Sequence, residues 1–134
     1  MSNTPSNKLR VTDYVANRIV ELGVKHVFTL TGGGAMFLND GVAMHPELEA
    51  VCNHHEQASA QGGVAYSKVK NSFAVVMPTT GCGSTNTITG LLDAWQDNIP
   101  CIFISGQVNK EQTSYNSQAK IRQFGVQEAN IIEI

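Results

Sequence analysis

Apolar residues in this chain follow two kinds of pattern, and the two patterns alternate. Residues 9–24, LRVTDYVANRIVELGV, repeat apolar side chains at helical spacing, and Gly23 is a natural helix stop. The run HVFTL at residues 26–30 is short and rich in β-forming residues, and TGGG follows it. The pattern therefore predicts a helix followed by a strand. The apolar positions of the helix are Leu9, Val15, Ile19 and Leu22.

The same alternation continues along the rest of the chain. We predict further helices over residues 35–44 and 53–69, and another that opens from the loop TTGCGSTN at 79–86. We predict further strands over residues 48–52, 72–78, 99–105 and 127–134. The strands are continuous apolar runs, which is typical of strands covered on both faces. We therefore expect an α/β fold, a three-layer α/β/α sandwich with a mostly parallel central sheet and right-handed crossovers.

Four loops follow the carboxyl ends of the predicted strands, and ligands bind at those ends in parallel sheets. Their sequences are TGGG, NHHEQ, TTGCGSTN and GQV. They hold glycine, hydroxyl and amide residues with one acid among them. We expect them to converge on one rim of the sheet.

Composition restricts the function classes. The chain has 134 residues, enough for one domain, with 42% apolar and 15% charged residues, which is typical of a globular protein. A net charge of −2 and the lack of a basic cluster argue against a nucleic-acid partner. No apolar run approaches the length of a membrane span, and no signal-peptide core is present, so we expect a cytoplasmic protein. We expect a flexible segment at residues 1–8 and one domain over 9–134.

The glycine loops do not match the common nucleotide-binding motifs. Neither TGGGAM nor TTGCGSTN ends in the Gly-Lys-Ser/Thr that a P-loop needs, and GCGSTN places Asn86 where a dinucleotide fingerprint needs a small residue. A tight turn remains an alternative interpretation of the three glycines at 32–34.

The three cysteines have wide spacing, which argues against a zinc site and a disulfide framework. We expect reduced thiols in or near the core for Cys52 and Cys101, since each lies in an apolar run. Cys82 lies before a helix, where a thiolate is favoured, but no specific base can be assigned to it, although His54 and His55 can lie on the same rim.

Two interpretations of Glu56 remain open from the residues alone. With Asn53 as N-cap, Glu56 falls three residues later, close to a capping box, and spacing favours this interpretation. Carboxylates at the rim of an α/β sheet are also candidates for proton chemistry. The neighbouring His54 and His55 point about 100° apart on a helix and do not form one metal-binding face.

Four blocks in order resemble one known family. They are GVKHVF with its glycine turn, HHEQASAQGGVAYSKV, TTGCGSTNTITGLLDAWQDNIPCIFISGQV and GVQEANII. Together they resemble the pyrimidine-binding domain of thiamine-diphosphate-dependent enzymes, most closely the acetolactate (acetohydroxyacid) synthase group. The resemblance extends from about Val11 to the end, and it implies the thiamine-diphosphate-binding fold.

The resemblance implies a catalytic role for Glu56. The glutamate of the family's HEQ block hydrogen-bonds N1′ of the cofactor aminopyrimidine and shuttles the proton that lets the 4′-imino tautomer deprotonate thiazolium C2. The implied activity is decarboxylation or carboligation of 2-keto acids, by a lyase or transferase acting on a small 2-keto acid or aldehyde. The resemblance also implies cofactor contacts at Gly33, Glu56, Thr80, Gly81, Cys82, Gly83 and Asn86, and substrate contacts at Gln107 and Gln127.

The chain departs from the family pattern at four positions. Thr31 stands near one position where the family usually has proline, and Cys82 stands at another. Lys68 replaces an arginine, and Val126 replaces an aromatic residue of the substrate pocket. The substrate therefore stays open. An alternative is a non-catalytic small-molecule-binding or regulatory α/β module that uses the same rim.

The family's other half-site is not found in this sequence. In the family, the diphosphate and Mg²⁺ are held by a second domain through a GDG…N motif, which does not occur here. We therefore expect a domain fragment of a longer homo-oligomeric enzyme, inactive by itself, with a naturally split subunit as the alternative. No metal ligands are expected in this chain.

Overall fold

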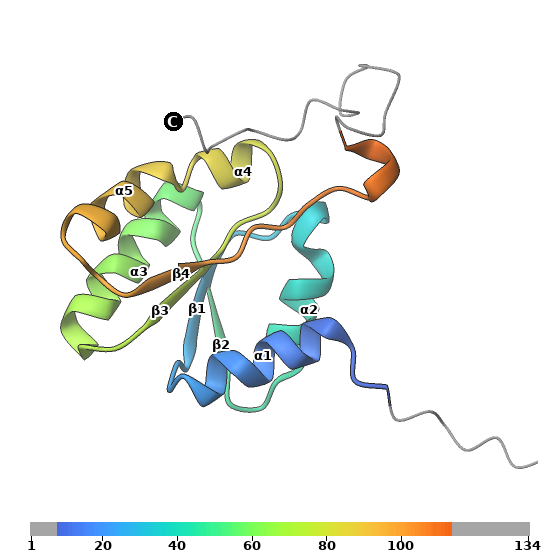
Figure 1. The fold of residues 1–134 in the computed structure, drawn as a ribbon, viewed down its shortest axis with the longest axis horizontal. Helices are drawn as coiled ribbons and strands as arrows, with labels where there is room; N and C mark the ends of the chain where they lie inside the picture. The colour runs from blue at the N-terminus through green and yellow to red at the C-terminus, as the bar shows by residue number, and fades with distance from the viewer. Residues whose placement is uncertain (1–7, 114–134) are drawn as a thin grey trace, which may run out of the picture.

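In the described part of the chain, every strand pair of the sheet is parallel. The computed structural model describes residues 8–113, and in this part four strands lie in the order β2-β1-β3-β4 (Figure 1). In register, Val27 pairs with Ala50 on one side and Val75 on the other, and Val75 pairs with Ile102. The strands are β1 (His26–Thr29), β2 (Glu49–Cys52), β3 (Ala74–Met77) and β4 (Cys101–Phe103).

Helices cover both faces of this sheet. The helices α1 and α2 pack together over one face, and α3 and α5 pack together over the other (Figure 1). The α/β expectation is therefore confirmed, with a four-stranded parallel sheet between helical layers. The helices are α1 (Val11–Glu21), α2 (Met36–Met44), α3 (Glu56–Lys70), α4 (Cys82–Thr85) and α5 (Ile88–Gln96), with 3₁₀ turns η1 (Gly33–Ala35) and η2 (Lys110–Gln112).

The two central strands explain the continuous apolar runs. In β1, Val27 packs into a cluster on the α1–α2 side, whereas Phe28 packs on the α3 side. All four residues of β3 are fully buried. Successive side chains of a strand point to opposite faces, so a strand covered by helices on both faces needs an apolar residue at every position.

The edge strand β2 does not follow that expectation. Ala50 and Cys52 are exposed, because β2 has a neighbouring described strand on one side only. The prediction that Cys52 is a core thiol is therefore wrong, whereas Cys101 on β4 is half-buried. Leu9 lies before α1 and is 59% exposed, so it does not extend the apolar face of that helix.

The strand order reverses between β1 and β3. The chain leaves β1 for α2 on one face of the sheet and leaves β3, through α4, for α5, which packs with α3 on the other face. In such sheets ligands bind at the carboxyl ends of the strands, at the point where the strand order reverses.

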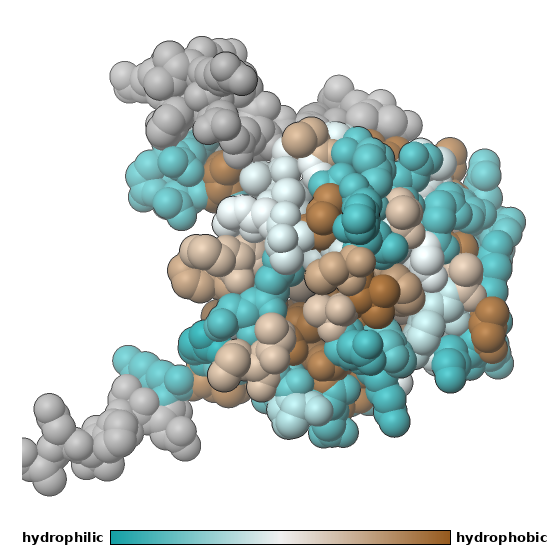
Figure 2. Space-filling view, turned by 180° about the vertical axis from the view of Figure 1, so that it is seen from behind, coloured by the Kyte–Doolittle hydropathy of each residue, from teal (hydrophilic) through white to brown (hydrophobic). Residues whose placement is uncertain are grey.

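Two sequence predictions fall outside the described residues. The proposed flexible segment at 1–8 has only Lys8 within them, and the predicted strand at 127–134 lies beyond them. None of the described helices combines the length and apolar character needed to cross a membrane. On the face drawn in Figure 2, apolar and hydrophilic side chains are interspersed.

Candidate functional site

Glu56 is the first residue of α3. The N-cap is His55, whose Nδ1 accepts a hydrogen bond from the backbone N–H of Gln57 at 3.1 Å. The capping-box interpretation with Asn53 as N-cap is therefore wrong. The Asn53 amide instead donates to Ser59 Oγ at 3.1 Å. Since His55 caps the helix, the carboxyl group of Glu56 is available for another contact.

That contact comes from the loop after β3. Glu56 is 9% exposed, and its Oε2 accepts a hydrogen bond of 2.9 Å from Asn86 Nδ2. The first turn of a helix is also a favourable place for a negative charge. One carboxylate oxygen is thus held by an amide that lies 30 residues away in sequence.

The second oxygen of Glu56 faces a position without a side chain. A Cβ built on Gly83 would lie 3.2 Å from Glu56 Oε1 and 2.6 Å from Thr79 Cγ2. Glycine at this position therefore keeps the space beside Oε1 open. No residue among 8–113 donates a hydrogen bond to Oε1.

The loop that carries Gly83 is held by its own backbone contacts. Gly81 has φ 65°, a conformation that residues with a Cβ rarely adopt. Ser84 Oγ donates to the carbonyl of Thr79 at 2.6 Å. Residues 79–86 thus form a turn that leads into the short helix α4 and returns Gly83 and Asn86 to Glu56.

The loops after β1 and β4 meet the same turn from the other side. Thr80 Oγ1 donates to Gln107 Oε1 at 3.0 Å. A Cβ on Gly34 would lie 2.6 Å from Thr80 Cγ2, and one on Gly106 would lie 2.4 Å from the carbonyl oxygen of Gly34. Only glycine allows the three loops to approach so closely. The structure thus brings the four predicted loops to one rim.

A buried polar network below the rim was missed by sequence reasoning. Thr29 Oγ1 donates to the Met77 carbonyl at 2.7 Å and joins the ends of β1 and β3. Ser59 Oγ donates to the Thr29 carbonyl at 3.1 Å and ties α3 to β1. The sequence carried two signals for this network. Thr29 is a hydroxyl residue at the end of an apolar strand, and Ser59 is a hydroxyl residue inside a helix that packs on the sheet. The network joins α3, which begins with Glu56, to the ends of β1 and β3.

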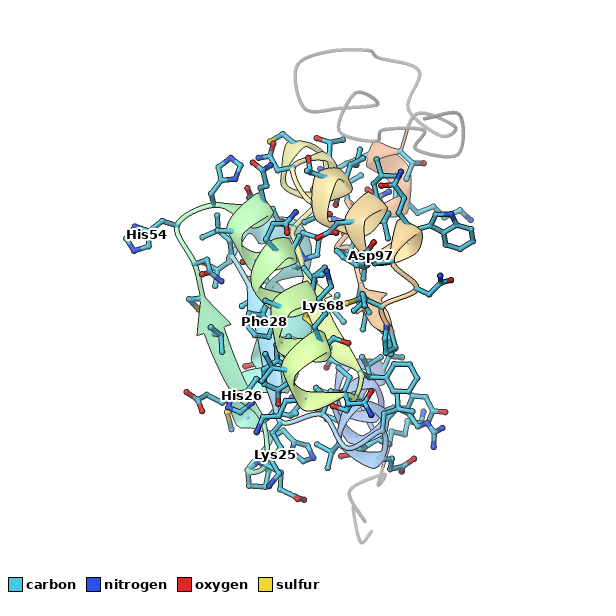
Figure 3. All side chains as sticks on the ribbon, turned by 90° about the vertical axis from the view of Figure 1, so that its left-hand side faces the viewer. Lys25, His26, Phe28, His54, Lys68 and Asp97 are labelled. Atoms are coloured by element: carbon cyan, nitrogen blue, oxygen red, sulfur yellow. The ribbon has the colours of Figure 1, made fainter. Side chains whose placement is uncertain are left out.

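The remaining predicted residues lie at the rim with fewer contacts. Gly33 is exposed, and a Cβ built on it would meet nothing within 4 Å. Cys82 is exposed as well. The side chain of His54 points away from the sheet (Figure 3), and Gln127 lies outside the described residues. Within residues 8–113, no group of three or more His, Cys, Asp and Glu side chains is placed to hold a metal ion.

This arrangement suits the exchange of a single proton. A buried carboxyl group with one oxygen held by an amide and the other beside an open glycine can share a proton with a weakly basic ligand atom. The surrounding groups are hydroxyls, amides and backbone, and they can position a ligand without adding charge. Paired-carboxylate chemistry is not supported, because Glu56 is the one acid in the four loops TGGG, NHHEQ, TTGCGSTN and GQV.

Comparison with known proteins gives one family match over nearly the whole chain. The family described as thiamine pyrophosphate enzyme, N-terminal TPP binding domain, matches residues 9–131. Acetolactate synthase large subunit of Buchnera aphidicola subsp. Acyrthosiphon pisum is 31% identical over 114 residues, which cover 85% of this chain and 20% of that protein. Acetolactate synthase isozyme 3 large subunit of Escherichia coli is 30% identical over 114 residues, which again cover 85% of this chain and 20% of that protein.

A mitochondrial relative is also similar. Acetolactate synthase, mitochondrial, of Schizosaccharomyces pombe is 41% identical over 85 residues, which are 63% of this chain and 13% of that protein. The chain therefore spans about a fifth or less of the length of these relatives.

Proposed function

The chain belongs to the family of thiamine pyrophosphate enzyme N-terminal TPP binding domains, and we propose that it forms the pyrimidine half of a cofactor site. The complete enzyme would be acetolactate synthase-like and would make or break C–C bonds next to the carbonyl of a small 2-keto acid or aldehyde. The observation that carries this proposal is the buried carboxyl group of Glu56, held by Asn86 at the rim where the loops converge.

The residues at the rim fit the aminopyrimidine ring of thiamine diphosphate. A flat ring needs an approach without side chains, and Gly83 leaves that space beside Glu56 Oε1. A ring nitrogen that gains a proton needs a carboxyl partner in a partly dry place, and Glu56 provides one. The backbone of Gly81 and the side chains of Thr80 and Cys82 lie on the same turn, where they can contact the ring face.

In this proposal each residue has a defined task. Glu56 exchanges a proton with ring atom N1′ through Oε1, while Asn86 Nδ2 holds Oε2 and so fixes the direction of the free oxygen. Gly33 exposes backbone at the turn after β1, where a substrate can approach. Bound thiamine diphosphate supplies the carbanion chemistry, and the protein positions it and tunes its acidity.

The other half of the cofactor site is assigned to a second domain. Mg²⁺ needs several oxygen ligands around a diphosphate, and residues 8–113 offer no acidic cluster for them. The relatives are about five times as long as the matched region, which leaves room for such a domain. We assign the diphosphate and Mg²⁺ to that domain, carried on the same polypeptide of a homo-oligomer, with a separate subunit as the alternative.

The decisive experiment replaces the carboxyl group alone. In the enzyme assembled from this chain and its diphosphate-binding domain, Glu56→Gln should slow exchange of the cofactor C2 hydrogen with solvent by about 10²–10⁴-fold, the usual contribution of a general acid or base. NMR of the bound cofactor in D₂O measures this rate. Glu47→Gln, at an exposed position, is the matched control.

Two results would contradict the proposal. Unchanged C2 exchange in Glu56→Gln, with cofactor binding retained, would favour the non-catalytic binding module. Carboligation or decarboxylation by the 134-residue chain in the absence of any second domain would contradict the assignment of a half-site.

A further inference from the structure

The side-chain amide of Gln107 is held in one orientation. Its Oε1 lies 3.0 Å from Thr80 Oγ1 and 2.8 Å from the backbone nitrogen of Val108. The backbone N–H of Val108 can only donate, so the atom that it contacts must be the amide oxygen. This assignment settles the direction of the amide without reference to its ligand.

The nitrogen of the same amide therefore points away from both donors. Gln107 is exposed, and no residue among 8–113 accepts a hydrogen bond from its Nε2. Both contacts of Gln107 use the oxygen, which leaves two N–H donors and little acceptor capacity for a ligand. A glutamine amide usually offers a ligand both an acceptor and a donor, but this one offers only its N–H donors.

The position of this amide is fixed relative to the rest of the rim. A Cβ on Gly106, its neighbour, would clash with the backbone of Gly34, and a Cβ on Gly34 would clash with Thr80. Thr80 lies on the same turn as Gly83, which borders Glu56. The donor nitrogen of Gln107 and the free oxygen of Glu56 are thus carried by one connected set of loops.

We propose that Thr80 is a positioning residue that holds Gln107 with its amide N–H groups outward, so that the rim donates to a carbonyl or carboxylate oxygen of the substrate there and does not accept a hydrogen bond from a substrate hydroxyl. The inference rests on the proposed function, because it assigns a specificity element to the same site. Its physical basis is the loss of acceptor capacity at Oε1, which the Thr80 hydroxyl and the Val108 N–H occupy together.

The first test measures the orientation itself and needs no activity. In the ¹⁵N-labelled 134-residue chain, the side-chain NH₂ of Gln107 should give a high heteronuclear NOE. That of Gln96, whose exposed side chain has no hydrogen bond in the described structure, should give a low one. Thr80→Val keeps the shape and removes the donor, and it should lower the Gln107 value toward that of Gln96. Thr80→Ser keeps the hydroxyl and should keep the Gln107 NOE high.

The second test measures the consequence for substrate binding. With pyruvate as the 2-keto acid probe and the assembled enzyme, Gln107→Glu still accepts from Thr80 and Val108 but presents no donor. We expect KM to rise about tenfold or more, with a smaller change in kcat, since one hydrogen bond to a charged or carbonyl group is lost. Gln107→Met, which adds no charge, should also raise KM, and Thr80→Val should raise it by less.

The outcomes separate this inference from the proposed function. A Gln107 amide as mobile as that of Gln96 in the unsubstituted chain, or unaffected by Thr80→Val, would overturn the positioning role. An unchanged KM in both Gln107→Glu and Gln107→Met would overturn the donor role. Neither result bears on Glu56, whose role depends on the C2 exchange rate, and unchanged exchange in Glu56→Gln would leave the NOE result standing.

Discussion

Asn86 Nδ2 donates a 2.9 Å hydrogen bond to Oε2 of the buried Glu56 carboxyl group. The two residues lie on different elements, since Asn86 follows α4 and Glu56 begins α3. This contact gives the carboxyl group a single direction, and it connects the loop after β3 to the helix after β2.

The contact should be measurable as a coupling between the two side chains. Asn86→Leu removes the donor and should destabilise the chain by about 1.5–3 kcal/mol, because a hydrogen bond to a charged group is lost. In a Glu56→Gln background the same substitution should cost less, since the acceptor is then neutral. Urea unfolding of the four variants in a double-mutant cycle measures the difference. An equal cost of Asn86→Leu in both backgrounds would contradict the contact.

Gly83 should tolerate no side chain. Gly83→Ala places a Cβ 2.6 Å from Thr79 Cγ2, and we expect a loss of about 1–3 kcal/mol in the free energy of unfolding. Gly33→Ala is the matched control for stability, because a Cβ there meets nothing within 4 Å. Thermal unfolding compares the two.

A second variant separates folding from the site. Thr79→Ser removes the methyl group that Gly83→Ala would meet, so the double variant should recover stability. It retains the 3.2 Å approach of the new Cβ to Glu56 Oε1, so cofactor binding should remain impaired. Equal stability of Gly83→Ala and Gly33→Ala would show that the turn is more open than the structure indicates.

An ion pair joins the two helices that cover the α3 side of the sheet. Lys68 Nζ lies 2.9 Å from Asp97 Oδ2, and the two side chains approach each other across α3 and α5 (Figure 3). The hydrogen bond to Asp97 raises the pKa of Lys68 above its ordinary value near 10.5. Because the folded pKa is the higher one, this stabilisation is complete below about pH 10.5 and is lost as the pH rises through the folded pKa.

Lys68→Met should therefore destabilise the chain slightly at neutral pH, and the difference should shrink in high salt, because the pair is exposed and screened. Lys70→Met, near the end of the same helix, is the control, since Lys70 has no ion pair in the described structure. Urea unfolding at two salt concentrations measures the effect. A loss for Lys68→Met that is independent of salt would contradict the electrostatic origin.

The three cysteines should differ in reactivity. Cys52 and Cys82 are exposed, whereas Cys101 is half-buried, and burial raises the pKa of the Cys101 thiol. Less thiolate is then present at Cys101 at neutral pH, so iodoacetamide should modify Cys52 and Cys82 first. Peptide mapping by mass spectrometry gives the order. Modification of Cys101 before the other two would contradict the burial of β4.

The elements were predictable because their signals are local. An apolar run without alternation identifies a strand covered on both faces, and β3, with every residue buried, fits this rule. Glycine and hydroxyl residues after each strand predicted the rim. The rule failed for β2, because burial depends on how many neighbours a strand has, and Ala50 and Cys52 sit at an edge.

The order of strands and helices, the parallel sheet and the loops that form the rim were determined by the sequence alone, since each follows from spacing and turn residues. Only the tertiary structure decided the environment of Glu56. Spacing favoured a cap, but His55 caps α3, and Asn86 holds the carboxyl group from a loop 30 residues later. Such a contact depends on the packing of Thr29, Ser59 and Gly83 beneath and beside it, which no periodicity in the chain records.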